Sequence, residues 1–193
     1  MVPVKEGPPL TFVVQAGGKG TRLGGVAKGL IQLDGERLIE RLLRLGAEWP
    51  CWVVANEPGF YADLDVPVVA DVVPGRGAPG GVVTSLAVAA TEWVLNVACD
   101  MPFVTRAAID RLLAATGPDV DVVCFQRGGR LEPLLALYRR SLRDGWAARL
   151  DEHPSLQALL RAARHRALVP DEPRVLDSLN TPDELARAGA SLR

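Results

Sequence analysis

Apolar residues along this chain form short continuous runs that alternate with segments in which apolar residues recur every three or four positions. The runs predict β-strands at 10–15, 51–55, 66–70, 93–98, 120–125 and 131–138. The helical spacing predicts helices at 37–47, 82–90, 105–115, 141–150 and 156–163, with a last helix after Thr181. Strands that alternate with helices predict an α/β fold, with a mostly parallel sheet and helices on both of its faces.

Single residues refine these elements. Pro67 has no N–H to give to a sheet, so the third strand is expected at an edge. Thr105 is a good N-cap for the helix that follows it. Thr181 and Glu184 have the spacing of a capping box at the start of the last helix. The glycine- and proline-rich segment 73–81 is expected to be a long loop.

The segment 15–28 follows the first strand and is rich in glycine and positive charge. Five of the nine residues in 17–25 are glycine, which lets successive backbone N–H groups converge on an anion. Lys19, Arg22 and Lys28 add positive charge. The segment therefore predicts a binding loop for the phosphates of a nucleoside triphosphate.

The spacing in this segment does not match two well-known phosphate-binding loops. A P-loop needs Ser or Thr after Gly-Lys, whereas Gly20 follows Lys19 here, and Val13 replaces the first glycine of that motif. The dinucleotide fingerprint needs a glycine where this chain has Leu23. We therefore do not expect an NAD(P)-dependent oxidoreductase.

Ligands of open parallel sheets bind beyond the carboxyl ends of the strands. Asn56, Asp71 and Asp100 each lie just past the end of a predicted strand, as the segment 15–28 does. We therefore expect these residues to share one edge of the sheet.

Composition narrows the class of ligand. A formal net charge of −1 argues against nucleic acid or an anionic membrane as the main partner, but allows a small phosphorylated ligand. Three cysteines without a CxxC motif and two histidines predict neither a disulfide nor a zinc site. No apolar run reaches the roughly 18 residues that a membrane helix needs. We expect a cytoplasmic protein without a signal peptide, with a single domain over 1–193 and a flexible leader at 1–9.

Motifs along nearly the whole chain resemble, in the same order, those of the molybdenum cofactor guanylyltransferase family. They are Ala16-Gly17-Gly18, Arg22, Gly24-Gly25, Lys28-Gly29-Leu30, Asn56, Asp71, Pro74-Gly75, Gly80-Gly81, Cys99-Asp100-Met101-Pro102, Glu132-Pro133-Leu134, Tyr138-Arg139-Arg140 and Asn180-Thr181-Pro182. The glycine loop alone is typical of the wider nucleotidyltransferase superfamily, and the late motifs favour the narrower family. Two positions depart from its pattern: Gln15 stands where the family usually has Leu, and Ala27 where it usually has Asp.

The resemblance implies a Rossmann-like nucleotidyltransferase domain that transfers GMP from GTP to the phosphate of molybdenum-molybdopterin. The products are molybdopterin guanine dinucleotide and pyrophosphate. The attacking phosphate has its second pKa at about 6, so the reaction needs no dedicated general base. By resemblance, Asp100 is the Mg²⁺ ligand, while Arg22 and Lys28 are catalytic residues that neutralise the charge of the triphosphate.

The resemblance also implies binding roles for other residues and further partners. GTP would be bound by Gln15, Ala16, Gly17, Lys28, Asn56, Asp71 and Asp100, with backbone groups of the first three at the guanine and ribose. Asn180 would lie near the pterin. Arg76, Arg127 and Arg130 are either partners of the pterin phosphate or solvated surface charges. Other cofactor-biosynthesis proteins and acceptor molybdoenzymes are the implied protein partners.

Two alternatives stay open at the level of the sequence. One is a related nucleotidyltransferase that uses CTP on the same pterin, or that acts on a sugar or isoprenoid phosphate. The other is a nucleotide-binding protein without catalytic activity. Ala27 supports this second alternative, because it removes a carboxylate close to the expected phosphates.

Overall fold

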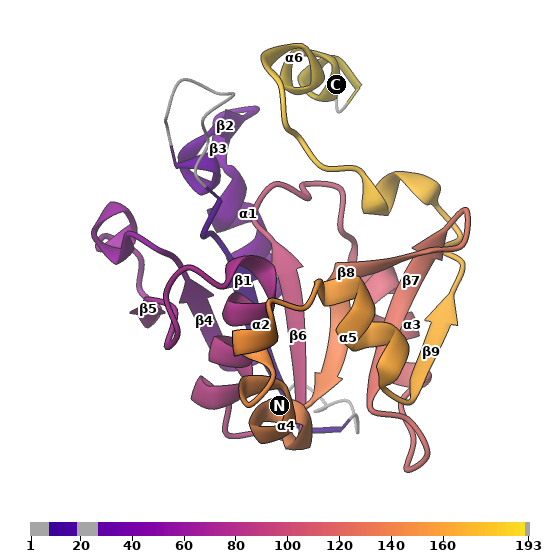
Figure 1. The fold of residues 1–193 in the computed structure, drawn as a ribbon. Coiled ribbons are helices and arrows are strands. Elements are labelled where there is room, and N and C mark those ends of the chain that lie inside the picture. The colour runs from indigo at the N-terminus through magenta and orange to yellow at the C-terminus, as the bar shows by residue number, and fades with distance from the viewer. Residues whose placement is uncertain (1–7, 19–26, 192–193) are drawn as a thin grey trace, which may run out of the picture.

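The computed structural model describes residues 8–18 and 27–191, in which a seven-stranded sheet has the order β5-β4-β1-β6-β8-β7-β9 (Figure 1). The strands are β1 Leu10–Gln15, β4 Cys51–Val54, β5 Val68–Val69, β6 Trp93–Ala98, β7 Val122–Arg127, β8 Arg130–Arg139 and β9 His165–Leu168. All strands that the apolar runs predict are therefore present, some with shifted ends.

The sheet is mostly parallel, as the sequence predicts. Only β8 runs against its neighbours β6 and β7, and the other adjacent pairs within the sheet are parallel. The turn Gly128-Gly129 explains the exception, because two residues can join only antiparallel strands. Both glycines have positive φ, 57° and 77°, as a tight hairpin turn requires.

The two edges of the sheet differ in how well the sequence predicts them. β5, which follows Pro67, lies at one edge as expected. β9 at the other edge pairs in parallel with β7 and is not among the predicted strands. Its sequence begins with His165 and Arg166, both exposed, so it lacks the apolar run that marks a strand.

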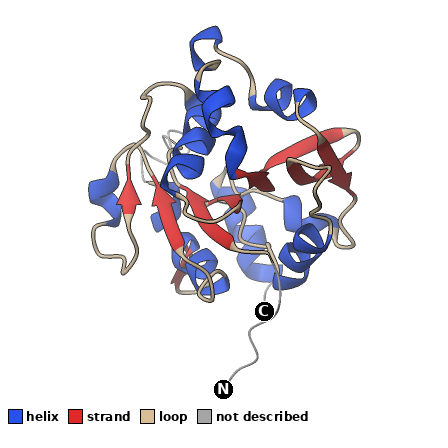
Figure 2. Ribbon diagram, turned by 90° about the horizontal axis from the view of Figure 1, so that it is seen from below, coloured by secondary structure: helices blue, strands red, loops and turns tan. Residues whose placement is uncertain are grey.

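Helices cover both faces of the sheet (Figure 2). They are α1 Leu38–Leu45, α2 Gly77–Val88, α3 Arg106–Ala114, α4 Arg143–Ala147, α5 Leu156–Ala162 and α6 Pro182–Ser191. Alternate residues of β1 face opposite cores: Phe12 packs in the cluster that contains α1 and α3, and Val13 in the cluster that contains α2, α4 and α5. The predicted α/β fold is thus confirmed.

Helix α2 begins at Gly77, so the expectation of a loop as far as residue 81 is wrong. Pro79 is tolerated because it lies in the first turn of the helix, where its missing N–H costs no helical hydrogen bond. Gly80 and Gly81 are buried, and Gly81 lets this turn approach Gln15 at the end of β1 closely. Packing against the sheet therefore outweighs the low helix propensity of glycine.

The C-terminal segment returns to the carboxyl edge of the sheet. Thr181 and Glu184 form the predicted capping box: the Glu184 N–H donates to Thr181 Oγ1, and the Thr181 N–H donates to Glu184 Oε2. Leu179 and Ala188 pack with Leu33 and Leu38, and α6 lies beside the hairpin formed by the two strands after β1 (Figure 1). These strands are β2 Gln32–Leu33 and β3 Glu36–Arg37.

Short 3₁₀ helices connect several of these elements. They are η2 Lys28–Leu30, η3 Pro58–Tyr61, η4 Arg140–Leu142, η5 Leu150–Glu152 and η6 Pro173–Leu176. Thr105 caps α3 as expected, since its side chain accepts a hydrogen bond from the Ala108 N–H. Among the described residues, no helix has the length and apolar character needed to cross a membrane.

Candidate functional site

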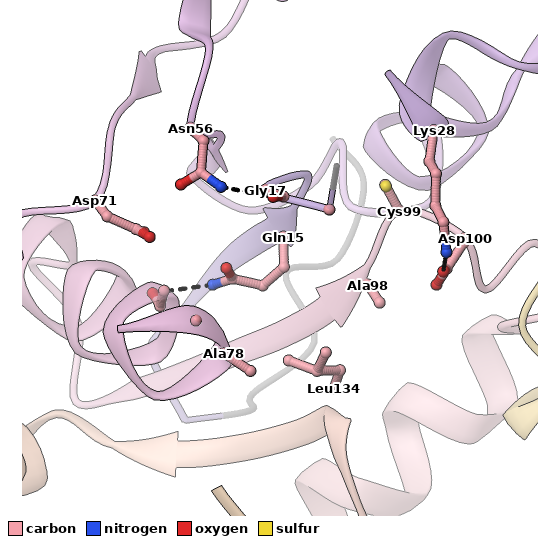
Figure 3. Close-up of a pocket in the computed structure, with 13 residues that line it drawn as sticks. Gln15, Gly17, Lys28, Asn56, Asp71, Ala78, Ala98, Cys99, Asp100 and Leu134 are labelled. Carbon is pink, nitrogen blue, oxygen red and sulfur yellow. Dashed lines mark hydrogen bonds and ion pairs between the residues drawn. The ribbon is translucent and has the colours of Figure 1, made fainter. Parts of the chain in front are cut away.

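A pocket of about 300 Å³ lies at the carboxyl edge of the sheet, where the ends of β1, β4 and β6 meet the start of α2 (Figure 3). Its lining residues are Gln15, Gly17, Gly18, Lys28, Asn56, Asp71, Gly77, Ala78, Gly81, Ala98, Cys99, Asp100 and Leu134. The edge that the sequence predicts as the ligand site is therefore the edge that carries this pocket.

The structure brings most of the predicted site residues together. Gln15, Gly17, Lys28, Asn56, Asp71 and Asp100 all line the pocket. Ala16 is buried and borders a smaller neighbouring cavity of about 80 Å³. Asn180 lies beside the pocket and reaches Lys28. Arg22 and Lys19 lie outside the described residues.

Lys28 and Asp100 form an ion pair at one side of the pocket (Figure 3). Lys28 Nζ lies 2.6 Å from Asp100 Oδ2 and donates a second hydrogen bond to Asn180 Oδ1, over 2.7 Å. The side chains of Lys28 and Asp100 are only 18% and 15% exposed, so water screens the pair little. One cation thus joins η2, the end of β6 and the segment before α6.

The segment that carries Asn180 is anchored directly to the Asp100 backbone. The Leu179 N–H donates to the Asp100 carbonyl over 2.8 Å. Asn180 Nδ2 donates to Ser178 Oγ over 2.9 Å, which leaves its Oδ1 directed at Lys28. The segment around Asn180 therefore belongs to the site, although Asn180 is far from the glycine loop in the sequence.

Asn56 and Asp71 occupy the other side of the pocket (Figure 3). Asn56 Nδ2 donates to the Gly17 carbonyl over 2.6 Å and so holds the start of the glycine loop. A Cβ at Gly17 would lie 3.3 Å from that nitrogen, so the close approach favours glycine. Burial raises the pKa of Asp71 above its ordinary value, and a hydrogen bond from Thr84 acts in the opposite direction.

Gln15 also faces the pocket with its side chain, whereas the sequence predicts a role for its backbone alone. Its Nε2 lies 3.1 Å from the Gly81 carbonyl and 2.6 Å from both Ser85 Oγ and Asn96 Oδ1. Its backbone carbonyl accepts a hydrogen bond from the Cys99 N–H. Ser85 and Asn96 are buried polar residues within a largely apolar helix and strand, and this is the signal in the sequence that could have revealed the network.

Leu134 completes the pocket from β8. Hydrogen bonds of its neighbours Glu132 and Pro133 hold this part of the strand in place. Glu132 Oε1 accepts a hydrogen bond from the Leu134 N–H over 3.1 Å. The Tyr138 hydroxyl donates to the Pro133 carbonyl over 2.6 Å. Burial raises the pKa of Glu132, so this carboxyl is easier to protonate than an exposed one.

The described residues contain no cluster of three or more His, Cys, Asp or Glu side chains that could hold a metal ion by themselves. Asp100 is a carboxylate of the pocket wall beside the cation of Lys28. Such a site fits Mg²⁺, which often takes one or two carboxylates and completes its shell with phosphates and water. Cys99 is a poor metal ligand here, because burial raises the pKa of its thiol to about 12.

A second, more open cavity of about 610 Å³ adjoins Asn180. It is lined by Phe103, Arg127, Arg174, Leu176, Asp177, Ser178, Leu179, Asn180, Glu184, Arg187 and Ala188. The Arg174 guanidinium stacks over the Phe103 ring at 3.8 Å from its centroid. Of the three arginines named for the pterin phosphate, Arg127 lines this cavity and is paired there with Asp177 over 2.8 Å. Arg76 is paired with Asp151 over 2.6 Å, and Arg130 is exposed.

Comparison with known proteins identifies a family to which this chain is similar. A family model described as the MobA-like NTP transferase domain matches residues 12–168, a range that includes all the lining residues of the pocket. The molybdenum cofactor guanylyltransferase of Vibrio cholerae serotype O1 is 31% identical over 98% of this chain and 96% of its own. The probable molybdenum cofactor guanylyltransferase of Carboxydothermus hydrogenoformans is 39% identical over 69% of this chain and 67% of its own.

Solved structures share the fold. The molybdopterin-guanine dinucleotide biosynthesis protein A from Archaeoglobus fulgidus superposes with a TM-score of 0.80, at 23% identity over 94% of this chain and 98% of that chain. A CMP:2-keto-3-deoxy-manno-octonic acid synthetase complexed with CTP gives a TM-score of 0.73 at 13% identity, over 95% and 98% of the two chains. At these identities the likeness establishes the architecture alone.

Proposed function

This chain belongs to the family with the MobA-like NTP transferase domain and is a nucleotidyltransferase, and we propose that it is a molybdenum cofactor guanylyltransferase. It would transfer GMP from GTP to the phosphate of molybdenum-molybdopterin and release pyrophosphate. The names of the relatives that it resembles over nearly its whole length support this choice.

The observation that carries the proposal is the division of the pocket into two chemically different sides. Lys28 and Asp100 form a charged side, suited to a triphosphate and its metal ion. Gln15, Asn56 and Asp71 form a side with two carboxamides and one carboxyl group, suited to the hydrogen-bond donors of a base and a ribose. A nucleoside triphosphate has the same two parts, with its phosphates at one end and its base at the other.

The proposed reaction depends on positioning and on charge neutralisation. The acceptor is a phosphate whose second pKa is about 6, so it is already ionised at neutral pH. Lys28 would stabilise negative charge on the triphosphate, as Arg22 would by resemblance to the family. Asp100 would hold Mg²⁺, and the ion would supply charge compensation at the phosphates. Neither His153 nor His165 lines the pocket, in keeping with a reaction that needs no general base.

Molybdopterin would bind beside Asn180, in the cavity that contains Phe103 and Arg127. An aromatic ring and arginines suit a planar ring system that carries a phosphate. Because Asn180 contacts Lys28, the acceptor and the triphosphate would meet at that lysine. A cytoplasmic location, and contacts with other cofactor-biosynthesis proteins and acceptor molybdoenzymes, stay predictions.

The test is turnover of the full chain with molybdenum-molybdopterin, Mg²⁺ and one of GTP, CTP or ATP. We expect release of pyrophosphate with GTP and a product whose mass increases by one GMP. A product that contains CMP would overturn the guanylyl assignment in favour of the CTP-dependent alternative. Tight GTP binding without release of pyrophosphate would favour a protein without catalytic activity.

The proposed metal site has its own test, the variant Asp100→Ala. We expect turnover to fall at least about 100-fold while the fold persists, because loss of an electrostatic group at the reacting phosphates typically has this effect. Steady-state kinetics and circular dichroism would measure the two quantities. Asp171→Ala is the control, since Asp171 is 78% exposed and does not line the pocket. Wild-type turnover in Asp100→Ala would exclude Asp100 as the metal ligand.

A further inference from the structure

The carboxamide of Gln15 is fixed in one orientation by its neighbours. The Gly81 carbonyl can only accept a hydrogen bond, so the Gln15 atom 3.1 Å away must be Nε2. The same nitrogen lies 2.6 Å from Asn96 Oδ1, and Ser85 Oγ lies 2.7 Å from that oxygen. If both amides were turned over, Asn96 Nδ2, which is buried without a partner, could donate to Gln15 Oε1. That oxygen would then face the Gly81 carbonyl oxygen, and the two acceptors would repel each other.

This orientation leaves Gln15 Oε1 as an acceptor at the pocket wall. No described residue donates to it, and it lies directly over Gly81, where a Cβ would overlap it. The same Cβ position lies 3.7 Å from Asp71 Oδ1. Gln15 Oε1 and Asp71 Oδ1 therefore both border the space next to Gly81. Figure 3 shows Gln15 and Asp71 converging on this side of the pocket.

Asn56 extends the same surface of acceptors. Its Nδ2 is held by the Gly17 carbonyl, so the atom left to face a ligand is Oδ1. Gln15, Asp71 and Asn56 therefore present oxygen acceptors on the side of the pocket away from Lys28. A surface of this kind selects a ligand edge that carries adjacent N–H donors.

Among the common bases, guanine has such an edge, formed by N1–H and the 2-amino group. Adenine presents a lone pair at N1 and only a C–H at position 2, and an acceptor surface repels that lone pair. We propose that Gln15 Oε1, next to Asp71, accepts a hydrogen bond from this edge of guanine and is a specificity-determining residue of the site. This inference rests on the proposed use of GTP and adds a side-chain contact at a position where the resembled family usually has Leu.

The experiment measures dissociation constants for GTP and ATP, with Mg²⁺, in the wild-type full chain and in Gln15→Leu and Gln15→Met. Both variants remove the acceptor, and Met keeps the length of the side chain in case Leu packs poorly. We expect the preference for GTP over ATP to fall about tenfold in each, as the loss of one hydrogen bond predicts. Ser85→Ala is the matched control, because it weakens the anchor of Gln15 but leaves Oε1 at the pocket wall.

The ratio of the two affinities separates recognition of the base from a merely structural role. If Gln15 only supports the end of β1, its variants will weaken GTP and ATP equally, and an unchanged ratio overturns the inference. A ratio that falls as much in Ser85→Ala as in Gln15→Met also overturns it. Preference of the wild-type protein for CTP or ATP would instead overturn the proposed function, and the inference with it.

Discussion

At the scale of single residues, the charged side of the pocket centres on Lys28. Its ammonium group contacts a carboxylate that follows β6 and an amide from the segment before α6, at 2.6 and 2.7 Å. Asp100 thus neutralises the cation that would meet the triphosphate. A bound Mg²⁺ would compete for Asp100 and leave Lys28 available to the phosphates.

The variant Lys28→Met tests this role, because it keeps the length of the side chain and removes the charge. We expect the affinity for GTP with Mg²⁺ to weaken by roughly 1.5–3 kcal/mol, as the loss of a charged hydrogen bond predicts. Isothermal titration calorimetry would measure it. Arg143→Ala removes an exposed cation outside the pocket and serves as the control. Equal GTP affinity in Lys28→Met and the wild type would leave Lys28 with a structural role only.

The site residues show what could be predicted from the sequence and what could not. Lys28, Asn56, Asp71 and Asp100 were predictable, because each is a polar residue just past a strand or in the glycine loop. The side-chain role of Gln15 was not, because its position looks like the end of a strand. Its carboxamide is held by groups from α2 and β6, and such long-range hydrogen bonds have no local pattern.

At the scale of elements, the first turn of α2 shapes the pocket. This turn leads to Gly81, which packs against Gln15. The local composition predicts a loop because glycine and proline disfavour helices. Strand β9 and the β2–β3 hairpin were missed for a related reason. They are short, and pairing with neighbours determines them more than their own apolar pattern does.

Gly81→Ala tests the close packing of α2 against β1. Alanine favours a helix, but its Cβ would overlap Gln15 Oε1, so we expect GTP affinity to fall at least about tenfold. Gly145→Ala in α4 is the matched control, since nothing lies within 4 Å of its Cβ position. That variant should gain roughly 0.5–1 kcal/mol of stability and keep its affinity. Unchanged GTP affinity in Gly81→Ala would show that the Gln15 side chain or the turn can move away without loss of binding.

At the scale of the whole molecule, one carboxylate links the segments next to three strands in the half of the sheet away from the glycine loop. Asp121 precedes β7, and its carboxylate accepts two hydrogen bonds from Arg164, which precedes β9, over 2.7 and 2.8 Å. Arg139 at the end of β8 lies 3.7 Å from the same carboxylate. Asp121 therefore contributes to the attachment of an edge strand that the apolar pattern does not predict.

This carboxylate makes the free energy of unfolding depend on pH. The hydrogen bonds from Arg164 hold the pKa of Asp121 below its ordinary value, so the folded state binds its proton less readily than the unfolded chain. The stabilisation is therefore complete above the unfolded pKa of about 3.9 and is lost as the pH falls through the lower folded value.

Asp121→Asn should consequently lower the free energy of unfolding by about 1 kcal/mol at pH 7, with a difference from wild type that shrinks toward pH 2. Urea unfolding at several pH values would measure it. Asp119→Asn is the control, because Asp119 is 73% exposed and its contact with Arg166 is 3.3 Å long. A pH-independent difference between Asp121→Asn and the wild type would mean that the charge of Asp121 does not account for its contribution to stability.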